Sequence, residues 1–180
     1  MQKLNSKQLR NLEAGQIDTA KIKKNEIYIV LDDILDTYNI GSIFRLADAV
    51  AAKKVILCKG SETPPNHRIK KASVNTMEIV DWQYFENTVD AINDLRQTVP
   101  NIKIVAVELT ENSVPYDTYE YELPIALVVG HETNSVSEDV LALCDAVVEL
   151  PMLGINISLN VMVSLAIVLY QVIENQKLDK

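Results

Sequence analysis

The hydrophobic positions of the chain fall into short blocks whose period changes along the sequence. Runs rich in β-branched residues are typical of strands, and one of them, Ile125–Val129, contains no polar residue, as expected in the middle of a parallel sheet. Other blocks place apolar residues three or four positions apart, which indicates helices. The pattern predicts strands at Glu26–Leu31, Val55–Cys58, Met77–Trp82, Ile102–Leu109, Ile125–Val129 and Ala146–Leu150, and helices at Asn39–Ala51, Thr88–Gln97 and Ser158–Glu174.

The order of these elements indicates the fold class, because strands and helices alternate throughout. This alternation favours an α/β fold with a mostly parallel sheet and helices on both faces. The segment Glu111–Pro124 is predicted to be an irregular acidic connection. Ser135 and Glu138 have the spacing of a capping box, so a further helix is expected to begin at Ser135. We expect a polar, basic arm over residues 1–25 and one domain over residues 26–180.

The last predicted helix is apolar around nearly its whole circumference, since Ser164 is the one polar residue between Val161 and Leu169. A helix that is apolar on all sides must be buried on all sides. In a domain of this size one face can pack on the sheet, and the rest is predicted to pack on a second copy of the chain, which favours a homodimer. The alternative is that another helix of the same chain covers it.

Length and composition restrict the class of protein. The chain has 180 residues, of which 48% are hydrophobic, and this suits one compact domain with a sizeable core. Its longest apolar run is far shorter than the roughly 20 residues that span a membrane, and the N-terminal residues contain no apolar signal region. Cys58 and Cys144 are interpreted as reduced, buried thiols, and His67 and His131 have no partner at ligand spacing. We expect a cytoplasmic protein without a membrane segment or a bound metal.

The formal net charge of −8 disfavours nucleic acid as a partner until its distribution is considered. Residues 1–25 carry six basic and two acidic side chains and residues 53–71 carry six and one, whereas residues 72–180 carry four and seventeen. Clustered cations on an acidic protein can form a phosphate-binding face, although solvated surface lysines are the simpler interpretation. The cations of the two basic blocks are Lys3, Lys7, Arg10, Lys21, Lys23 and Lys24, and Lys53, Lys54, Lys59, Arg68, Lys70 and Lys71.

Several common ligand sites are disfavoured by the spacing of glycine, serine and histidine. No two of the five glycines are spaced as GxGxxG or GxxxxGK require, which argues against Rossmann dinucleotide binding and P-loop chemistry. No serine lies in a GxSxG elbow, and only two histidines are available as a general base. Both observations argue against a serine hydrolase.

Three groups of polar residues follow predicted strands or begin predicted helices. Asn39 is placed to cap a helix that carries Arg45, and an arginine beside free backbone N–H groups can hold a phosphate. Glu132 follows Gly130 at the mouth of the central strand, where a carboxylate can act as an acceptor. The tripeptide Ser158–Asn160 opens the last helix, with Ser158 as the expected N-cap. Each group also has a structural interpretation: a cap with a surface arginine, a helix-dipole partner and a plain N-cap.

In this order and spacing, the three groups resemble the motifs of the SpoU-type (TrmH-like) RNA ribose methyltransferases of the SPOUT superfamily. The resemblance covers about residues 26–174. The first motif is matched by Asn39 and Arg45, the second by Gly130 and Glu132 with a later Pro-Met-x-Gly at Pro151–Gly154, and the third by Ser158–Asn160. The segments that are similar to the family's loop after its second strand are Thr63–Pro65 and Ile69–Lys71.

The resemblance implies a C-terminal deep trefoil knot, which periodicity alone would never suggest because true knots are rare. It also implies that the knotted loops bind S-adenosyl-L-methionine and that the domain dimerises through the knot region. By matching positions, the residues expected to contact this cofactor are Gly130, Leu150, Met152, Gly154 and Leu159.

The implied reaction is methyl transfer from S-adenosylmethionine to a ribose 2′-OH of tRNA or rRNA, without a metal. Arg45 is expected to hold a phosphate of the target nucleotide and to stabilise developing alkoxide charge, because a guanidinium stays protonated and is a poor base. Asn39, Glu132, Ser158 and Asn160 are expected to position Arg45, the ribose and one another. The alternative is a catalytically inactive family member that binds RNA or a partner.

The turn after Glu132 departs from the family pattern, because Thr133–Val136 lacks the glycine that many members have there. Asn134 is the residue that could adopt the left-handed backbone conformation that glycine often supplies. Asn156 also stands where lysine is frequent in the family. Cofactor binding therefore depends most directly on the geometry of this turn.

Overall fold

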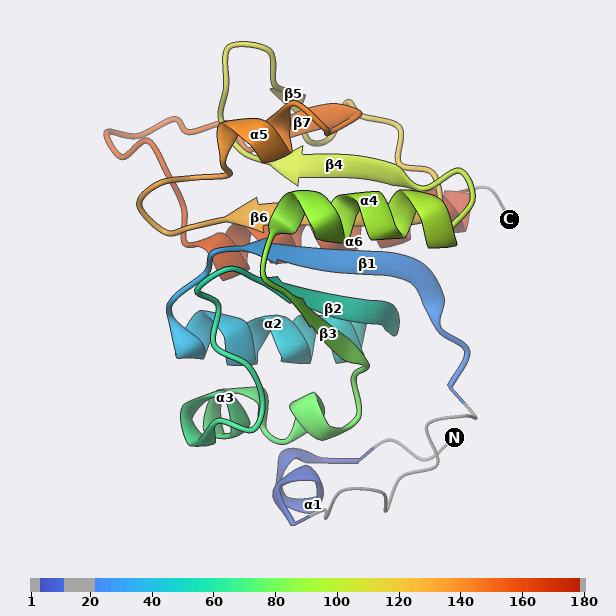
Figure 1. Ribbon diagram of the computed structural model, residues 1–180, viewed down its shortest axis with the longest axis vertical. Coiled ribbons are helices and arrows are strands. Elements are labelled where there is room, and N and C mark those ends of the chain that lie inside the picture. Colours follow the sequence, from blue (N-terminus) through green and yellow to red (C-terminus); the bar gives the residue numbers. More distant parts are fainter. Residues whose placement is uncertain (1–3, 12–21, 179–180) are drawn as a thin grey trace.

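The computed structural model describes residues 4–11 and 22–178, and its centre is a seven-stranded sheet (Figure 1). The strand order is β3-β2-β1-β6-β4-β7-β5, and every neighbouring pair is parallel, as the alternation of strands and helices predicts. The strands are β1 (Asn25–Asp32), β2 (Ala52–Cys58), β3 (Trp82–Phe85), β4 (Lys103–Val107), β5 (Val114–Pro115), β6 (Ile125–Gly130) and β7 (Ala146–Glu149).

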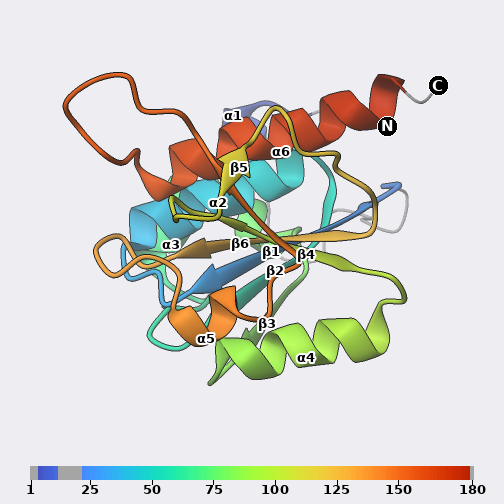
Figure 2. The same cartoon turned by 90° about the horizontal axis from the view of Figure 1, so that it is seen from above.

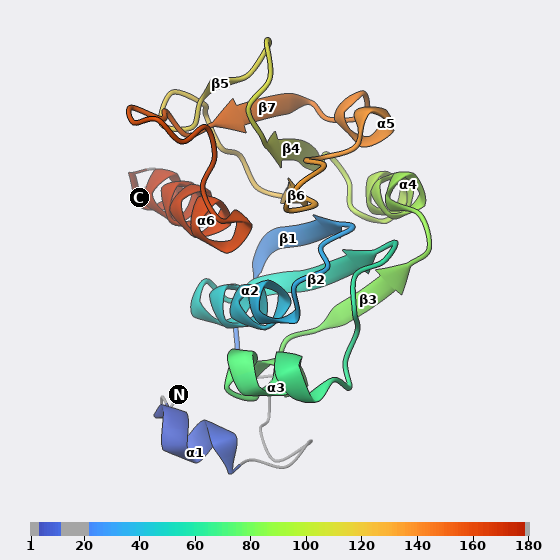
Figure 3. The same ribbon diagram turned by 90° about the vertical axis from the view of Figure 1, so that its left-hand side faces the viewer.

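Helices cover both faces of the sheet, which confirms the predicted layers (Figure 2). Helices α2, α3 and α6 lie on one face of the sheet, and α4 and α5 lie on the other. The short helix α1 and the 3-10 helix η2 are on the same side as α2 and α3 (Figure 3). Their bounds are α1 (Ser6–Arg10), α2 (Thr37–Ala49), α3 (His67–Ser73), η2 (Thr76–Glu78), α4 (Thr88–Thr98), α5 (Glu138–Leu141) and α6 (Val161–Leu178).

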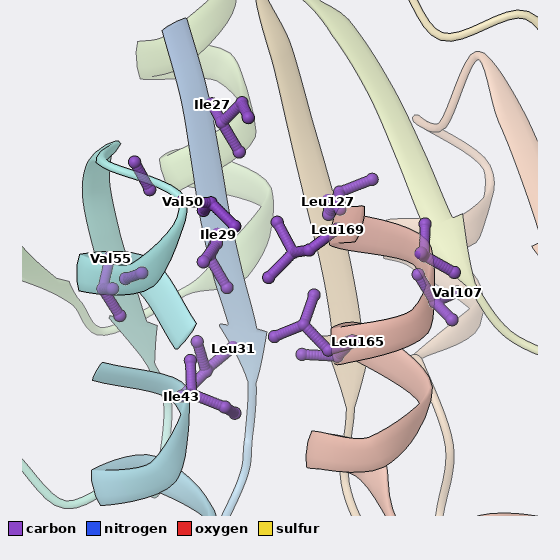
Figure 4. Close-up of a cluster of buried hydrophobic side chains, with 14 of the residues drawn as sticks. Ile27, Ile29, Leu31, Ile43, Val50, Val55, Val107, Leu127, Leu165 and Leu169 are labelled. Atoms are coloured by element: carbon purple, nitrogen blue, oxygen red, sulfur yellow. The ribbon is translucent and has the colours of Figure 1, made fainter. Parts of the chain in front are cut away.

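The core has two parts because successive side chains of a strand point to opposite faces of the sheet. On the α2 and α6 side, Ile29 of β1 and Leu127 of β6 pack with Ile43, Leu165 and Leu169 of the two helices (Figure 4). All five are fully buried, and each contributes about 1.5–3 kcal/mol relative to an exposed side chain. The second cluster, on the α4 and α5 side, includes Tyr28, Val30, Ile56, Ile92, Ala126, Val128 and Val140.

Helices α2 and α3 pack so closely that Gly41 has no room for a side chain. A Cβ atom there would lie 2.5 Å from the Cβ of Ala72 and 2.8 Å from the carbonyl oxygen of Ile69. The hydrophobic pattern does not predict α3, since a seven-residue helix with one buried apolar side chain, Ile69, gives too little periodicity to detect. The close approach at Gly41 fixes its place against α2.

The predicted strand Met77–Trp82 is wrong. The chain forms η2 over its first residues, and the strand β3 begins at Trp82. Val74 and Asn75 have positive φ angles of 52° and 67°, so α3 ends and the chain turns before it can extend. The apolar residues that suggested a strand are buried in the core on the α2 side instead of in the sheet.

The starts of three helices also differ from prediction. Helix α2 begins two residues early, because the side chain of Asp36 caps it by accepting the backbone N–H of Tyr38 at 2.8 Å. Asn39 is therefore inside the first turn and is not the N-cap. The capping box at Ser135 is wrong, since α5 begins at Glu138 and Ser135 has a φ of 63°. The last helix begins at Val161, three residues after the expected Ser158.

The N-terminal segment is described only in part. Helix α1 is tied to the domain by the side-chain amide of Asn75, which donates to the carbonyl oxygen of Leu9 at 2.9 Å. Residues 1–3 and 12–21 of the predicted arm lie outside the described residues, so its division from the domain stays a prediction, as does the trefoil knot. Over residues 4–11 and 22–178, no helix combines the length and apolar character needed to cross a bilayer.

Candidate functional site

The carboxyl ends of β1, β6, β4 and β7 meet at one edge of the parallel sheet, and a cleft of about 380 Å³ opens there. In open α/β sheets this edge is where ligands bind. The walls of the cleft come from the end of β4, the loop after β6 and the loop that joins β7 to α6. The lining residues are Val107, Glu108, Leu109, Val129, Gly130, His131, Glu132, Ser135, Glu149, Leu150, Met152, Asn156, Ile157, Ser158, Leu159, Asn160, Val161 and Ser164.

One side of the cleft carries a hydrogen-bonded chain formed by one residue from each of the three motifs. The Nδ2 atom of Asn39 donates to Oε1 of Glu132 at 3.1 Å, and Nδ2 of Asn160 donates to Oδ1 of Asn39 at 3.1 Å. Asn39 is buried between its two partners. Residues that are 93 and 121 positions apart in sequence thus fix each other's orientation, as the motif resemblance implies.

Glu132 also accepts backbone N–H groups at the start of α2. Its carboxylate accepts the backbone N–H of Asp36 at 3.1 Å and of Leu35 at 3.3 Å, two donors just before the helix. Burial raises the pKa of Glu132, but the hydrogen bonds from Asn39 and from these backbone groups outweigh it, so the pKa lies below its ordinary value. Glu132 is therefore ionised and accepts hydrogen bonds from three other residues, which makes it a positioning group and a poor general base.

Asn160, and not Ser158, caps the last helix. Its Oδ1 accepts the backbone N–H of Met162 at 3.0 Å, and its carbonyl oxygen accepts the N–H of Ser164 at 3.0 Å. The amide of Asn160 consequently serves two roles, since its other end holds Asn39. Ser158 lines the cleft and is exposed, and among the described residues its hydroxyl has no hydrogen-bond partner, so it is free to meet a ligand.

The glycine-free turn after β6 closes without strain at Asn134. Ser135 takes the left-handed conformation instead, which corrects the expectation for Asn134. The backbones of His131 and Ser135 exchange hydrogen bonds of 3.0 and 3.2 Å, and Nδ1 of His131 accepts the N–H groups of Thr133 and Asn134 at 2.9 and 3.1 Å. The imidazole thus satisfies two backbone N–H groups of the turn, and the turn closes without a further glycine.

Gly130 is required by a close approach of the backbone. A Cβ atom at this position would lie 2.3 Å from both the carbonyl carbon of Ser135 and the amide nitrogen of Val136. Any side chain would push the turn away from β6, and the turn carries Glu132. Gly130 therefore belongs to the site through its lack of a side chain as well as through its place in the cleft.

Sequence reasoning missed Asp32, a nearly fully buried carboxylate at the end of β1. Its Oδ1 accepts from Oγ1 of Thr88 at 2.6 Å and lies 2.9 Å from Nζ of Lys59. Its Oδ2 accepts from the backbone N–H and the hydroxyl of Ser137 at 2.9 and 2.7 Å. The carboxylate joins β1, the loop after β2 and the starts of α4 and α5, and so anchors the far end of the turn that carries Glu132.

The ionisation of Asp32 follows from these partners. Burial raises its pKa, but the hydrogen bonds from Thr88, Ser137 and Lys59 outweigh that effect and hold the pKa below its ordinary value. The same pairing raises the pKa of Lys59 against the effect of burial. The sequence feature that could have revealed the cluster is an acidic residue directly after a buried strand with a lysine directly after the next one, at the same sheet edge.

The residues expected to contact a cofactor are only partly brought together. Gly130, Leu150, Met152 and Leu159 line the cleft. Gly154 does not, and a Cβ atom there would meet nothing within 4 Å. It belongs to the loop between β7 and α6, which projects from the molecule (Figure 2).

Arg45 also lies apart from the cleft. It is exposed on α2, it does not line the cleft, and among the residues described its guanidinium has no hydrogen bond or ion pair. A long side chain free to move is suited to meet a substrate that arrives from solution. Its expected role in catalysis stays a prediction.

Thiols and metal ligands add no chemistry to the cleft. Burial raises the pKa of Cys58 and of Cys144 to about 12, which makes both poor nucleophiles. Within the described part of the chain, no three His, Cys, Asp or Glu side chains gather as a metal site.

Comparison with known proteins identifies the family to which these motifs belong. The model of the SpoU rRNA Methylase family matches residues 26–170, which is most of the chain and includes all three groups of motif residues. The chain belongs to the SpoU rRNA methylase family. YacO of Bacillus subtilis, a protein assigned to the TrmH family of tRNA/rRNA methyltransferases, is 28% identical over 162 residues, which are 89% of this SpoU-family chain and 64% of YacO.

Other SpoU-family relatives extend this picture. A Staphylococcus aureus protein assigned to the same TrmH family is 31% identical over 80% of this chain and 57% of its own length, so the chain spans 57–64% of these two curated relatives. The fold is shared with the TrmH/SpoU tRNA modifying enzyme of A. aeolicus, with a TM-score of 0.79, 24% identity and coverage of 97% and 83% of the two chains. An AdoMet-bound rRNA methyltransferase of Sinorhizobium meliloti has a TM-score of 0.77, 26% identity and coverage of 92% and 59%.

Proposed function

We propose that the protein transfers a methyl group from S-adenosyl-L-methionine to a ribose 2′-OH of tRNA or rRNA. The single observation that carries this proposal is the chain of hydrogen bonds from Glu132 through Asn39 to Asn160 along the side of the cleft. It joins one residue from each of the three motifs, from three separate parts of the chain, with Asn39 buried between its two partners. The family and the AdoMet-bound relative, 26% identical, support the choice of cofactor.

The residues of the cleft fit this cofactor. A volume of about 380 Å³ is within the range of sites for small ligands, and apolar surface from Leu150, Met152 and Leu159 suits an adenosine group. Glu108, Glu132 and Glu149 place carboxylates around the same space, which favours a ligand that carries a sulfonium and an ammonium group. When bound, S-adenosylmethionine supplies an electrophilic methyl group on a positively charged sulfur.

The remaining work is orientation and charge stabilisation by the residues of the chain. The ribose hydroxyl must lie in line with the methyl group and must lose its proton. Because Glu132 is held ionised by several donors, it fixes Asn39 and the start of α2 and does not take that proton. Ser158, exposed in the cleft without a partner among the described residues, is placed to hydrogen bond with the ribose.

Arg45 completes this mechanism on the substrate side. Its guanidinium holds a phosphate of the target nucleotide and stabilises the charge that develops on the ribose oxygen, while the proton leaves to phosphate or water. Two further parts of the proposal concern assembly: the protein works as a homodimer, and RNA phosphates contact its basic blocks. A cytoplasmic location also stays a prediction.

Two measurements test the function. Isothermal titration with S-adenosylmethionine should give saturable binding below millimolar concentration. Mass-spectrometric mapping of 2′-O-methyl sites in RNA from cells with and without the protein should then show one or more sites that depend on it. Absence of S-adenosylmethionine binding at near-millimolar concentration would refute the proposed enzymatic activity. Binding to RNA without any methyl site that depends on the protein would favour an inactive, RNA-binding family member.

A further inference from the structure

A second hollow lies beside β3, the strand at the end of the sheet opposite to β5. It has a volume of about 390 Å³ and shares no residue with the cleft described above. The loop after β2 forms one side and the outer residues of β3 form the other. The lining residues are Gly60, Ser61, Glu62, Thr63, Trp82 and Tyr84.

Two aromatic side chains give this hollow an apolar wall. Trp82 and Tyr84 are two positions apart on β3, so they share a face of the sheet, and they are 37% and 41% exposed. Their register partners on β2, Val55 and Leu57, belong to the core under α2, so the aromatic pair projects on the face that carries α2 and α3. The hydroxyl of Tyr84 donates to the carbonyl oxygen of Lys59 at 2.7 Å, which holds the ring against the loop.

The same hollow contains a polar atom that lacks a partner. Ser61 is only 4% exposed, and its Oγ has no hydrogen-bond partner among the described residues. A buried hydroxyl without a partner is unfavourable, and native proteins seldom leave one. Because Ser61 lines the hollow, a ligand there that can donate or accept a hydrogen bond is a candidate partner for its hydroxyl.

The charges around the hollow favour a base inside it and phosphates outside it. Glu62 is the acidic residue of the lining, and its carboxylate disfavours a phosphate there but can accept an amino group of a base. Next to the loop, the exposed cations Arg68, Lys70 and Lys71 lie on α3; Lys70 has a distant ion pair with Glu78, 3.7 Å between Nζ and Oε1. Among the described residues Arg68 and Lys71 have no ion pair, so their charges can meet the phosphates of a nucleic-acid strand.

The hollow lies near the edge of the sheet where the candidate active site opens. The cleft begins at the end of β6, which is three strand positions from β3, and at the usual spacing this is roughly 14 Å across the strands. One strand of RNA can pass both places. Aromatic side chains beside a basic surface are the usual platform for unpaired bases.

We propose that the hollow formed by Trp82, Tyr84 and Ser61 binds an unpaired base of the substrate RNA close to the methylated nucleotide. The base stacks on the aromatic wall, Ser61 and Glu62 hydrogen bond with its edge, and the cations of α3 hold the neighbouring phosphates. This inference rests on the proposed function, which supplies RNA as the substrate, and it assigns part of the choice of target to this end of the sheet.

Trp82 gives a direct probe because it is the only tryptophan of the sequence. Addition of single-stranded hexaadenylate should quench its fluorescence in a saturable way, because a base stacks on the indole. An RNA duplex with the same number of phosphates should quench much less. If hexaadenylate binds, as shown by fluorescence anisotropy of a labelled strand, but leaves Trp82 emission unchanged, the hollow is not the base site.

Variants extend the test beyond fluorescence. Trp82→Ala should weaken binding of fluorescein-labelled hexaadenylate about tenfold, and Trp82→Phe should restore most of it. Gln83→Ala is the matched control, since Gln83 lies between the two aromatic residues on the opposite face of the same strand, where among the described residues its side chain accepts only from Lys54, at 3.1 Å. With substrate RNA, Trp82→Ala should raise KM and leave kcat and cofactor affinity unchanged.

The outcomes separate this inference from the proposed function. If the wild-type protein methylates no RNA, the proposed function fails, whereas quenching by hexaadenylate still decides the role of the hollow. If the protein methylates RNA but Trp82→Ala has the same KM as Gln83→Ala, the base site is refuted. A change in oligomeric state in Trp82→Ala with unchanged RNA affinity would also overturn it, because the edge strand would then be a protein interface.

Discussion

The side chain of Arg45 has no partner within the described chain, unlike those of Asn39, Glu132 and Asn160. Asn39, Glu132 and Asn160 hold one another, whereas Arg45 is exposed. A residue that binds substrate and stabilises the transition state can be removed without loss of the fold. We therefore expect Arg45→Ala to lower the rate of methyl transfer by about 100- to 1000-fold, the usual effect of removing one electrostatic stabiliser.

The measurement is a single-turnover assay with radiolabelled S-adenosylmethionine and substrate RNA. Cofactor affinity and thermal stability of Arg45→Ala should equal those of the wild type. Arg45→Lys should retain part of the rate, since it keeps the charge but loses the planar pair of donors. Near-normal activity in the alanine variant would remove Arg45 from the mechanism.

Two glycines that were assigned together to cofactor binding have different surroundings. A side chain at Gly130 would overlap the backbone of Ser135 and Val136, whereas a side chain at Gly154 would meet nothing. We expect Gly130→Ala to displace the turn, to lower the free energy of unfolding by about 2 kcal/mol or more and to abolish cofactor binding. Gly154→Ala should change stability by less than about 0.5 kcal/mol.

Thermal denaturation and isothermal titration of the two variants check this prediction. The pair is a matched control, since both substitutions add one methyl group to a glycine, Gly130 at the end of β6 and Gly154 in the loop after β7. Equal stability of the two variants would show that the turn can shift at little cost and that Gly130 is not required by the close approach.

Residue types and spacing predicted which side chains gather, but not how each is used. Asn39, Glu132 and Asn160 do meet, as the motifs imply. Asp36 caps α2 in place of Asn39, and Asn160 caps α6 in place of Ser158, because these side chains are the ones that reach the free backbone N–H groups. Such distances arise only when the loops have packed, and therefore could not be predicted from the pattern.

At the scale of elements, the apolar pattern predicts strands and long helices well because burial in a parallel sheet leaves a strong signal. It fails at η2, where Met77 and Val80 are buried by a turn and not by a strand. It also misses the Asp32 cluster, because an apolar pattern carries no signal for a buried carboxylate whose partners come from three other segments.

The pair of Asp32 and Lys59 should stabilise the packing of these elements much more than an exposed ion pair does. Asp32→Asn removes a buried charge that accepts four contacts, so we expect a loss of about 2–3 kcal/mol at neutral pH. Lys53 and Glu26 form the matched control: their ion pair is 2.8 Å long and nearly half exposed, and Lys53→Ala should cost less than about 1 kcal/mol.

The same pair makes the predicted loss depend on pH. Because the folded state holds the pKa of Asp32 below its ordinary value of 3.8, its contribution is fully present above that pH and is lost as the pH falls through the lowered folded-state value. Chemical denaturation at several pH values should therefore show a constant difference between wild type and Asp32→Asn above pH 5. The difference should shrink in acid, and a pH-independent difference would contradict the role of the charge.

At the scale of the whole molecule, the loop between β7 and α6 leaves apolar side chains in water. Leu153 is 97% exposed and Ile155 is as exposed as in an extended chain, and Ile157 follows them. On α6, Leu165 and Val168 are buried against the sheet and α2, while Val163 is partly exposed. The expectation that one face of α6 packs on the sheet is confirmed. That a second copy of the chain covers the remaining apolar side chains stays a prediction.

A second copy of the chain is the simplest cover, because exposed apolar residues run from Leu153 and Ile155 through Ile157, which borders the cleft, to Val163 on α6. We expect a dimer at micromolar concentration. Leu153→Asp and Ile155→Asp should each weaken it about 30-fold, roughly 2 kcal/mol, since each places a charge in a desolvated interface. Gln97→Glu on α4, at the opposite face of the sheet, adds a charge without touching this surface (Figure 2).

Sedimentation equilibrium separates the outcomes, and circular dichroism shows whether each variant is folded. If the loop variants are folded monomers that also lose cofactor affinity while Gln97→Glu remains a dimer with normal affinity, the partner holds the loop in its binding conformation. This coupling follows from the structure, because Met152, Ile157 and Leu159 of the same loop line the cleft. A wild-type monomer that binds S-adenosylmethionine with full affinity would show instead that the loop is ordered by the cofactor alone.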